Sequence, residues 1–394
     1  MRGSLEVADI FRMHGAAYCQ THNHKMPVRH LRVMRAIEIC RTAGLGGHVD
    51  ECDHCGALRI SYNSCRNRHC PKCQSLGKER WVEARKRDLL PTPYFHLVFT
   101  LPEGLRSLTL RNQQVLYSIL FGSASETLKD LTEEPKHLGA EVGFIAIVHT
   151  WSQTLMDHPH LHCIVTGGGL SLEGNQWVSC KGEFFLPVKV LSRLFRGKFL
   201  AYLKEAHQKG ELAFPGKIAS LKEKDAFKAL LKALYKQEWV VYCKPPFQSA
   251  EMVMDYLGRY THRVAICNDR LVKLEKGRVT FRYRDRNDKD TVKLMTLDAS
   301  EFIRRFLLHI LPDGFVKIRH YGILSNRSRK NKLALCKQLL GVECRNENKE
   351  KHREPWEDLL ERITGLNPRI CPYCGKGKMV LKEVLNPSAL PSPP

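Results

Sequence analysis

Two closely spaced cysteine pairs, CDHC at 52–55 and CPKC at 70–73, constrain the fold of this 394-residue chain more than any other feature. A CxxC turn directs two thiolates at one point, and two such turns complete a tetrahedral Zn²⁺ site. The spacing therefore predicts a structural zinc ion, in a segment with too few apolar residues for a core of its own. The predicted ligands are Cys52, Cys55, Cys70 and Cys73.

Further metal donors surround these pairs, and the sequence does not say which of them take part. One donor could replace a predicted cysteine, or several could bind a second ion; they are His48, His54, Cys65 and His69. A third pair, Cys371 and Cys374, is typical of half a zinc ribbon, and Cys336 with Cys344 or His352 is available for the other half. Single cysteines in apolar surroundings are predicted to be small core residues: Cys19, Cys40, Cys163 and Cys267.

The charge of the chain is strongly positive: 63 Lys and Arg residues against 41 Asp and Glu residues give +22 at pH 7. Such an excess suits a polyanionic partner, usually nucleic acid. An anionic membrane surface is the weaker alternative, because no basic amphipathic anchor stands out. No signal-peptide core and no apolar run near the ~18 residues of a membrane span occur, so we expect a cytoplasmic protein without a membrane partner. Its 15 cysteines then favour metal binding over disulfides.

The hydrophobic pattern mixes strands and helices along the chain. Apolar and alternating runs predict strands at 94–102, 142–151 and 160–168, and a hairpin at 278–297. Helical periodicity predicts helices at 5–20, 28–42, 74–90, 104–131 and 249–262, and two more between 188 and 236. This order indicates an α+β fold, with an antiparallel sheet flanked by helices and a small helical, zinc-binding domain before it.

The stretch HPHLHCIVTGGG places His160 and His162 two residues apart on a predicted strand. Residues i and i+2 share one face of a strand, so the two imidazoles form a divalent-cation site with open positions. Gln153 is the predicted third ligand, because a hairpin that closes around Asp157 brings it opposite this pair. His149 is the alternative, although the same register moves it farther along the strand.

Tyr256 and Tyr260 lie four residues apart on a predicted helix, so their phenols share one face. Aromatic residues at this spacing usually pack in a core. The histidine pair, the cysteine clusters and the charge together favour a catalytic role instead. A tyrosine oxygen attacks phosphorus once its proton is removed and the phosphate is polarised. Its normal pKa is ~10, and a metal ion with the neighbours Arg259, His262 and Arg263 would ease ionisation.

The chain resembles the HUH endonucleases, named for a His–hydrophobic–His motif that here reads HLH. More closely, it resembles the two-tyrosine rolling-circle transposases of bacterial insertion sequences. The resemblance covers nearly the whole chain and rests on five blocks in order: SCRNRHCPKCQ, HLVFTLP, HTWSQTLMDHPHLHCIVTGGG, YLGRYTHRVAI and HYGILSNRSR.

This resemblance implies that His160 and His162 bind Mg²⁺ or Mn²⁺ on the scissile phosphate of single-stranded DNA. Tyr256 and Tyr260 would be the nucleophiles, forming a 5′-phosphotyrosine and a free 3′-hydroxyl. The absence of a GxxxxGK[ST] phosphate loop agrees with a reaction that needs no ATP. The implied partners are single-stranded or hairpin ends of a mobile element, a target strand and a host helicase.

On this interpretation the chain divides into three segments. Residues 1–92 form a zinc- and DNA-binding domain, 93–320 the HUH catalytic domain, and 321–394 a basic region with the last CxxC pair and a disordered tail. A rolling-circle replication initiator shares the nicking chemistry and is one alternative. A non-enzymatic zinc-finger DNA-binding protein is the other, and it predicts DNA binding without covalent capture.

Overall fold

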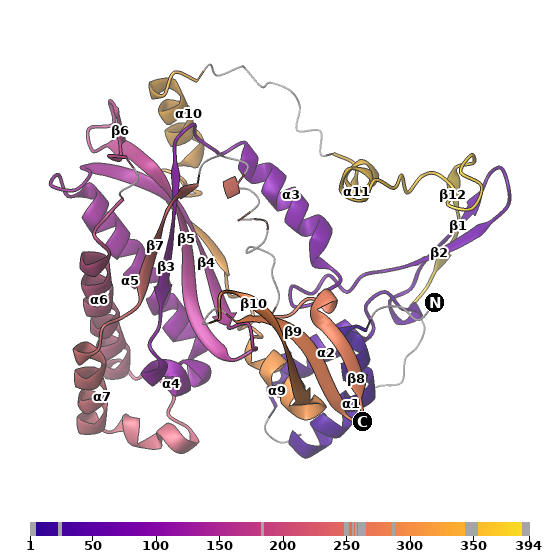
Figure 1. The fold of residues 1–394 in the computed structure, drawn as a ribbon, viewed down its shortest axis with the longest axis horizontal. Helices are drawn as coiled ribbons and strands as arrows, with labels where there is room; N and C mark the ends of the chain where they lie inside the picture. Colours follow the sequence, from indigo (N-terminus) through magenta and orange to yellow (C-terminus); the bar gives the residue numbers. More distant parts are fainter. Residues whose placement is uncertain are drawn as a thin grey trace.

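The computed structural model describes residues 5–22, 26–182, 185–247, 265–285, 288–342 and 354–387, together with residues 252, 253, 256 and 258. The side chains of residues 74 and 75 are not described. Within this part of the chain the elements form a large central sheet with its helices, a smaller helical unit, and a peripheral ribbon (Figure 1).

The central sheet has six strands and is antiparallel, which confirms the predicted α+β class. The order is β11-β4-β5-β3-β7, and β6 pairs with the distal end of β5. The strands are β3 (Tyr94–Thr100), β4 (Ala140–Trp151), β5 (Asp157–Ser171), β6 (Trp177–Ser179), β7 (Val241–Phe247) and β11 (Ile318–Gly322). The three strands predicted at 94–102, 142–151 and 160–168 are its centre.

Alternation along β5 sends its side chains to two different surroundings. Leu161, Cys163 and Val165 lie in a fully buried core on one face. That face is covered by α5 (Gln113–Glu133), α6 (Val188–Gln208) and α7 (Lys224–Lys236), with α4 (Arg106–Arg111) and the 3₁₀ turns η3 (Glu103–Leu105) and η4 (Gly216–Lys222) beside them (Figure 1). No helix within the described ranges is long and apolar enough to cross a bilayer.

The opposite face of the sheet carries the histidines of β5. Its apolar part, which includes Ile147 and Ile164, packs against Val82 and Leu333. These two residues come from α3 (Gln74–Lys86), within the predicted basic helix, and α10 (Arg329–Leu339). Two apolar cores therefore hold the central sheet in place and leave one end of the second face to polar residues.

A second unit combines both early and late parts of the sequence. The helices α1 (Val7–His22), α2 (Val28–Glu38) and α9 (Ala299–Leu308) share one core with the sheet β10-β9-β8. Its strands are β8 (Leu271–Glu275), β9 (Arg278–Asp285) and β10 (Thr291–Asp298), so the predicted hairpin is confirmed. Phe11 and Phe306 meet edge to face across this core, with ring centroids 5.3 Å apart.

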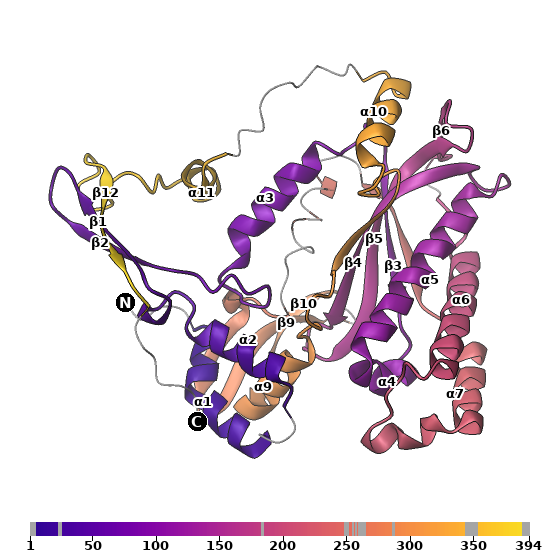
Figure 2. The ribbon, with the colours of Figure 1, turned by 180° about the vertical axis from the view of Figure 1, so that it is seen from behind.

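The third group is a ribbon built from both ends of the sequence. β1 (Gly47–Cys52) lies between β2 (Leu58–Tyr62) and β12 (Met379–Leu385), and α11 (Trp356–Thr364) precedes β12. Figures 1 and 2 place this ribbon at the periphery, away from the central sheet. The division at 1–92, 93–320 and 321–394 stays a prediction, and contacts cross both of its boundaries. Most of the tail predicted to be disordered, residues 388–394, lies outside the described residues.

His309 ties the second unit to the central sheet. Its Nε2 donates to the Leu155 carbonyl oxygen at 3.1 Å, and its Nδ1 accepts from the Thr150 hydroxyl at 3.1 Å. Burial lowers the pKa of His309 to about 4, so the ring is neutral at pH 7. The neutral tautomer fits both hydrogen bonds, because a carbonyl oxygen only accepts.

Acidification is expected to destabilise the fold through this histidine. The pKa of His309 is about 4 in the folded chain and ~6.5 when unfolded, so only the unfolded state takes up a proton as the pH falls from 6.5. This proton uptake lowers the free energy of unfolding by about 2 kcal/mol between pH 7 and pH 5. Urea titrations at both pH values should show this difference in the free energy of unfolding. The difference should be smaller by about 2 kcal/mol in His309→Gln. An unchanged dependence in the variant would contradict the assignment.

Candidate active site and zinc centres

Three histidines converge at one end of the central sheet. His160 and His162 lie on β5, and His149 lies directly opposite His160 on β4. One nitrogen of each ring lies within 4.8 Å of the others, which is a spacing that a single metal ion can bridge. The sheet therefore brings the predicted pair together with a third imidazole.

The orientation of His160 suits a metal ligand. Its Nδ1 lies 2.7 Å from the carbonyl oxygen of His158, which only accepts, so Nδ1 carries the proton. Nε2 is then the nitrogen that carries the lone pair. A hydrogen bond of this kind commonly fixes the tautomer of metal-binding histidines.

The predicted position of Gln153 is wrong, because the hairpin turns earlier than expected. β4 ends at Trp151, and the Ser152 amide donates to the Met156 carbonyl at 2.9 Å, which closes the turn. Gln153 therefore lies in the turn, and His149 takes the place opposite His160. The Leu155 backbone has a positive φ of 61°, which lets this short turn close.

Tyr256 lies directly beside the histidines. Its Oη is 3.0 Å from Nδ1 of His162 and 2.6 Å from Nε2 of His96, and these two nitrogens are 2.9 Å apart. Tyr256 is only 8% exposed, and it packs in the apolar core that also holds Ile147 and Ile164. The phenol oxygen thus has two imidazole nitrogens within hydrogen-bonding distance.

His96 was not among the predicted site residues. It lies on β3 opposite Ile164, so it shares the face that carries His162. Burial is the main cause that lowers the pKa of His96 to about 3, with Lys244 and His160 as smaller causes. The ring is therefore neutral at pH 7 and can accept the phenol hydrogen bond. The sequence shows only that His96 lies on a predicted strand, and the pairing of β3 with β5 is what brings it to the histidine motif.

Tyr260 and its basic neighbours Arg259, His262 and Arg263 lie outside the described residues. The pairing of the two tyrosines on one helix face therefore stays a prediction. Met252, Val253, Tyr256 and Gly258 are helical, as expected for the segment 249–262.

The first zinc centre differs from the predicted one by two ligands. Cys70 and Cys73 join Cys40 and Cys65, and all four thiol sulfurs lie within 4.8 Å of one another. The Sγ of Cys73 is 3.2 Å from that of Cys40 and 3.5 Å from that of Cys65. Cys40 is buried in a core, as predicted, and the structure makes it a candidate zinc ligand as well.

The second zinc centre joins the two ends of the sequence. Cys52 and Cys55 meet Cys371 and Cys374, with Sγ–Sγ distances of 3.7 Å for Cys52–Cys374 and for Cys55–Cys371. Four sulfurs at ~2.3 Å from a tetrahedral zinc lie about 3.8 Å apart, so this spacing fits the ion. The amide hydrogen of Gly377 leads the causes that lower the pKa of the Cys374 thiol to about 6, which favours the thiolate.

These two clusters replace both predicted arrangements. Cys52, Cys55, Cys70 and Cys73 do not share one site. The last CxxC pair finds its other half in Cys52 and Cys55, whereas Cys336 lies on α10 and is buried in the core. Cys344 and His352 lie outside the described residues. Of the extra donors, only Cys65 joins a cluster within the described part of the chain.

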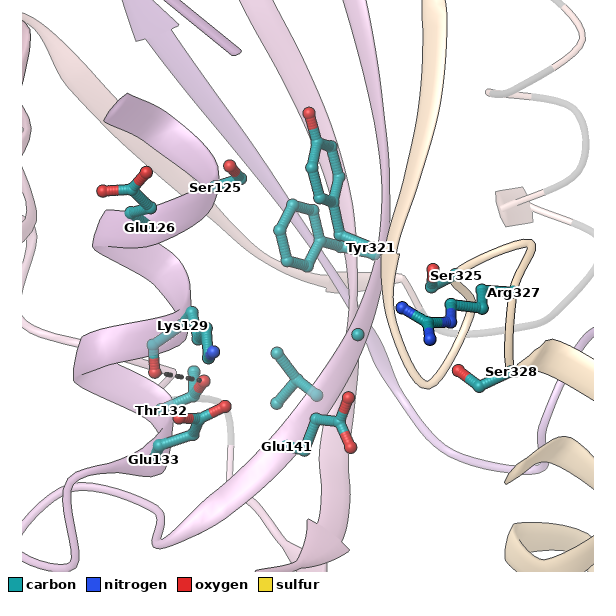
Figure 3. Close-up of a pocket in the computed structure, with 13 residues that line it drawn as sticks. Ser125, Glu126, Lys129, Thr132, Glu133, Glu141, Tyr321, Ser325, Arg327 and Ser328 are labelled. Atoms are coloured by element: carbon teal, nitrogen blue, oxygen red, sulfur yellow. Dashed lines mark hydrogen bonds between the residues drawn. The ribbon is translucent and has the colours of Figure 1, made fainter. Parts of the chain in front are cut away.

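A separate pocket of about 290 Å³ opens between α5, β4 and β11 (Figure 3). Tyr321, Ser325, Arg327 and Ser328 of the block HYGILSNRSR line it. Figure 3 shows carboxylates and cations of other residues mixed around the same space. Phe144 in its wall belongs to the core on the α5 face, so the pocket lies on the opposite side of the sheet from His162.

Comparisons with known proteins place the chain among transposases. The family described as "Transposase zinc-binding domain" matches residues 10–101, and the family described as "Putative transposase" matches residues 143–332. The chain is 51% identical over 385 residues to "Putative transposase y4qJ" of Sinorhizobium fredii (strain NBRC 101917 / NGR234), covering 98% of this chain and 96% of that protein.

A second relative is more distant. The "Transposase for insertion sequence element IS801" of Pseudomonas savastanoi pv. phaseolicola is 28% identical over 291 residues, covering 73% of this chain and 68% of that protein. Among solved structures, "Conjugative Relaxase TrwC in complex with mutant OriT Dna" matches with 12% identity and a TM-score of 0.23. That match covers 66% of this chain and 95% of the relaxase, and the TM-score is too low to bear on the fold.

Proposed function

The chain belongs to the two-tyrosine HUH transposases of the IS91 type, which carry a zinc-binding domain, and on this basis we propose that it nicks and rejoins single-stranded DNA at insertion-sequence ends. The observation that supports this proposal most is the position of Tyr256. Its Oη lies 3.0 Å from His162, which is a member of the three-histidine cluster.

His149, His160 and His162 are the residues that would hold a catalytic Mg²⁺ or Mn²⁺. When bound, such an ion polarises a non-bridging oxygen of the scissile phosphate and orients the phosphate. The donor set fits a divalent cation with open coordination positions, because it offers three imidazoles from two adjacent strands. Neutral His160 presents Nε2, as its Nδ1–H is held by the His158 carbonyl.

Tyr256 is the proposed nucleophile. Of its two histidine partners, one stabilises the phenolate and the other accepts the phenol proton. With Nε2 of His162 serving as a ligand, the Nδ1–H of His162 donates to Oη and stabilises the phenolate. The phenol hydrogen points to Nε2 of His96, the shorter contact at 2.6 Å. We infer that the proton moves toward His96 as the Oη–P bond forms.

The covalent step conserves the energy of the phosphodiester. Tyr256 Oη bonds to phosphorus, the P–O3′ bond breaks, and the 3′-oxygen leaves with the electron pair and takes a proton from water. The 5′-phosphate remains on the tyrosine, so a later attack by a 3′-hydroxyl can reseal the strand without ATP. Tyr260 is the proposed second nucleophile, which would hold a second strand while the first is attached. The element end would bind the zinc-bearing units and the basic helix α3.

The test is covalent capture of a labelled strand. The protein is mixed with Mn²⁺ and a single-stranded oligonucleotide from the element end, labelled 3′ of the scissile bond, and analysed on a denaturing gel. We expect an adduct that survives SDS, depends on the ion and is lost in Tyr256→Phe. Tyr235→Phe, at an exposed position of α7, is the matched control and should form the adduct normally.

Two other results would overturn the proposal in different ways. Binding of the oligonucleotide without any adduct would support a non-enzymatic DNA-binding protein. Adduct formation and resealing without transfer to a second strand would support a replication initiator. A double variant Tyr256→Phe/Tyr260→Phe that still forms an adduct would exclude both tyrosines.

Replacement of His96 with alanine is expected to slow adduct formation about 100-fold, because Oη loses its proton acceptor. His96→Gln should restore part of this rate, since an amide oxygen accepts the hydrogen bond and orients the phenol. The rate constants come from single-turnover time courses, and anisotropy measures DNA binding, which should not change. Equal losses in the two variants would indicate a merely structural role.

A further inference from the structure

A cleft of about 600 Å³ lies between the second unit and the helices of the central sheet. Its walls come from the start of α2, from α4, from η4 and from α9, and both ribbon views place α2 and α9 at the level of α4 (Figure 2). None of the described residues that line it carries a carboxylate, and four carry cationic side chains: Arg29, Arg111, Lys217 and Arg304.

These cations are largely unneutralised. Arg304 pairs with Glu301, with N–O distances of 2.6 and 2.9 Å. Arg111 and Lys217 are exposed, and neither forms a salt bridge with an acidic group in the described part of the chain. Like charges gathered in a concave space repel one another, and an anionic ligand relieves that repulsion.

The fourth cation, Arg29, is held in place by a buried amide. Gln113, only 8% exposed, accepts from Nη2 of Arg29 at 3.1 Å and donates to the Leu308 carbonyl at 3.2 Å. Nε of Arg29 is buried, and it has no hydrogen-bond partner among the described residues. Arg29 lines the cleft, and a preoriented guanidinium suits a phosphate oxygen.

The cleft adjoins the catalytic end of the sheet through α9. Leu308, in its wall, is followed by His309, whose ring bonds to Thr150, the residue after His149. The wall of the cleft is thus connected through α9 to the strand that carries His149. A chain of phosphates matches a row of separated cations better than a single small anion does.

We propose that this cleft binds the sugar-phosphate backbone of the DNA strand that extends from the cleaved phosphate. This inference rests on the proposed function for the identity of the polyanion. The contacts are to phosphates, so the cleft contributes affinity and position, without sequence preference.

The test uses the double variant Arg111→Gln/Lys217→Gln and measures affinity for a single-stranded oligonucleotide over a range of salt concentrations. Loss of two phosphate contacts should reduce the slope of log K against log salt by about 1.4, and weaken binding at least ~10-fold at 0.1 M salt. The matched control is Lys228→Gln/Lys232→Gln on α7, which removes the same charge from exposed positions outside the cleft. We expect less than a threefold change in the control.

Equal weakening in both double variants, or wild-type affinity in the cleft variant, would overturn the proposal. Covalent capture separates this question from the catalytic one. The wild-type protein is used for this comparison, because Arg111 and Lys217 belong to the proposed binding cleft. Absence of adduct from the wild-type protein would instead contradict the proposed function, and the affinity comparison would still decide the role of the cleft.

Discussion

Replacement of His162 with alanine is expected to reduce adduct formation at least ~1,000-fold, the largest catalytic effect of any single change in the histidine cluster. One ring serves two purposes: it offers a nitrogen to the ion, and its Nδ1 lies 3.0 Å from the nucleophilic Oη of Tyr256. Without the ion to polarise the phosphate, the transition state loses several kcal/mol of stabilisation, and each 1.36 kcal/mol is a factor of ten in rate. Single-turnover adduct formation on the denaturing gel measures the effect.

His158→Ala is the matched control for this variant. His158 is the neighbouring histidine of the same motif and stands outside the cluster, and its backbone carbonyl, which alanine retains, accepts the hydrogen bond from His160. We expect a change below threefold, together with unchanged thermal stability in both variants. A comparable loss in His158→Ala would mean that the motif contributes to folding rather than to chemistry.

The identity of the third ligand follows from a parallel comparison. His149→Ala should raise the Mn²⁺ concentration for half-maximal adduct formation by at least ~10–100-fold, whereas Gln153→Ala should leave it nearly unchanged. The reason is the register, which places His149 opposite His160 and Gln153 in the turn. The reverse result would show that the turn rearranges when the ion binds.

Removal of zinc ligands is expected to have the largest effects on folding. Cys70→Ser should destabilise the second unit severely, because Cys40 and Cys70 are buried in the core shared by α1, α2 and α9. A structural zinc ion contributes on the order of 10 kcal/mol of folding free energy. Thermal unfolding and zinc content, measured together, should show a lower Tm and the loss of one of two bound ions.

Removal of a ligand from the second zinc centre should have a different effect and should show which cysteine pairs share an ion. Cys374→Ser should lose one ion, release residues 356–387 to limited proteolysis and leave the central sheet folded. The double variant Cys52→Ser/Cys374→Ser should still bind one zinc, whereas Cys52→Ser/Cys70→Ser should bind none. If Cys52 and Cys70 shared a site, the last variant would lose no more zinc than either single one.

Local patterns in the sequence were enough to predict the class of fold and much of the candidate site. Alternation and apolar runs located β3, β4 and β5, and the two-residue spacing put His160 and His162 on one face. The five sequence blocks indicated the family that the comparisons show. Each of these inferences depends only on residues near one another in the chain.

The errors arose where distant segments meet. CxxC pairs indicate zinc but do not indicate which pairs share an ion, and Cys55 and Cys371 are 316 residues apart. A hairpin that closes earlier than expected put His149, and not Gln153, opposite His160. His96 became visible only through the pairing of β3 with β5. Neither propensity nor spacing encodes such neighbours, because they depend on tertiary packing and on register.

The ribbon that joins β1 to β12 also affects how the protein is made. During synthesis on the ribosome, Cys52 and Cys55 emerge long before Cys371 and Cys374, so the peripheral centre stays half built until translation has passed residue 374. A nascent or prematurely terminated chain can complete the Cys40 centre but cannot close this one. If DNA engagement requires the closed ribbon, only polypeptides translated beyond that point would act on the genome.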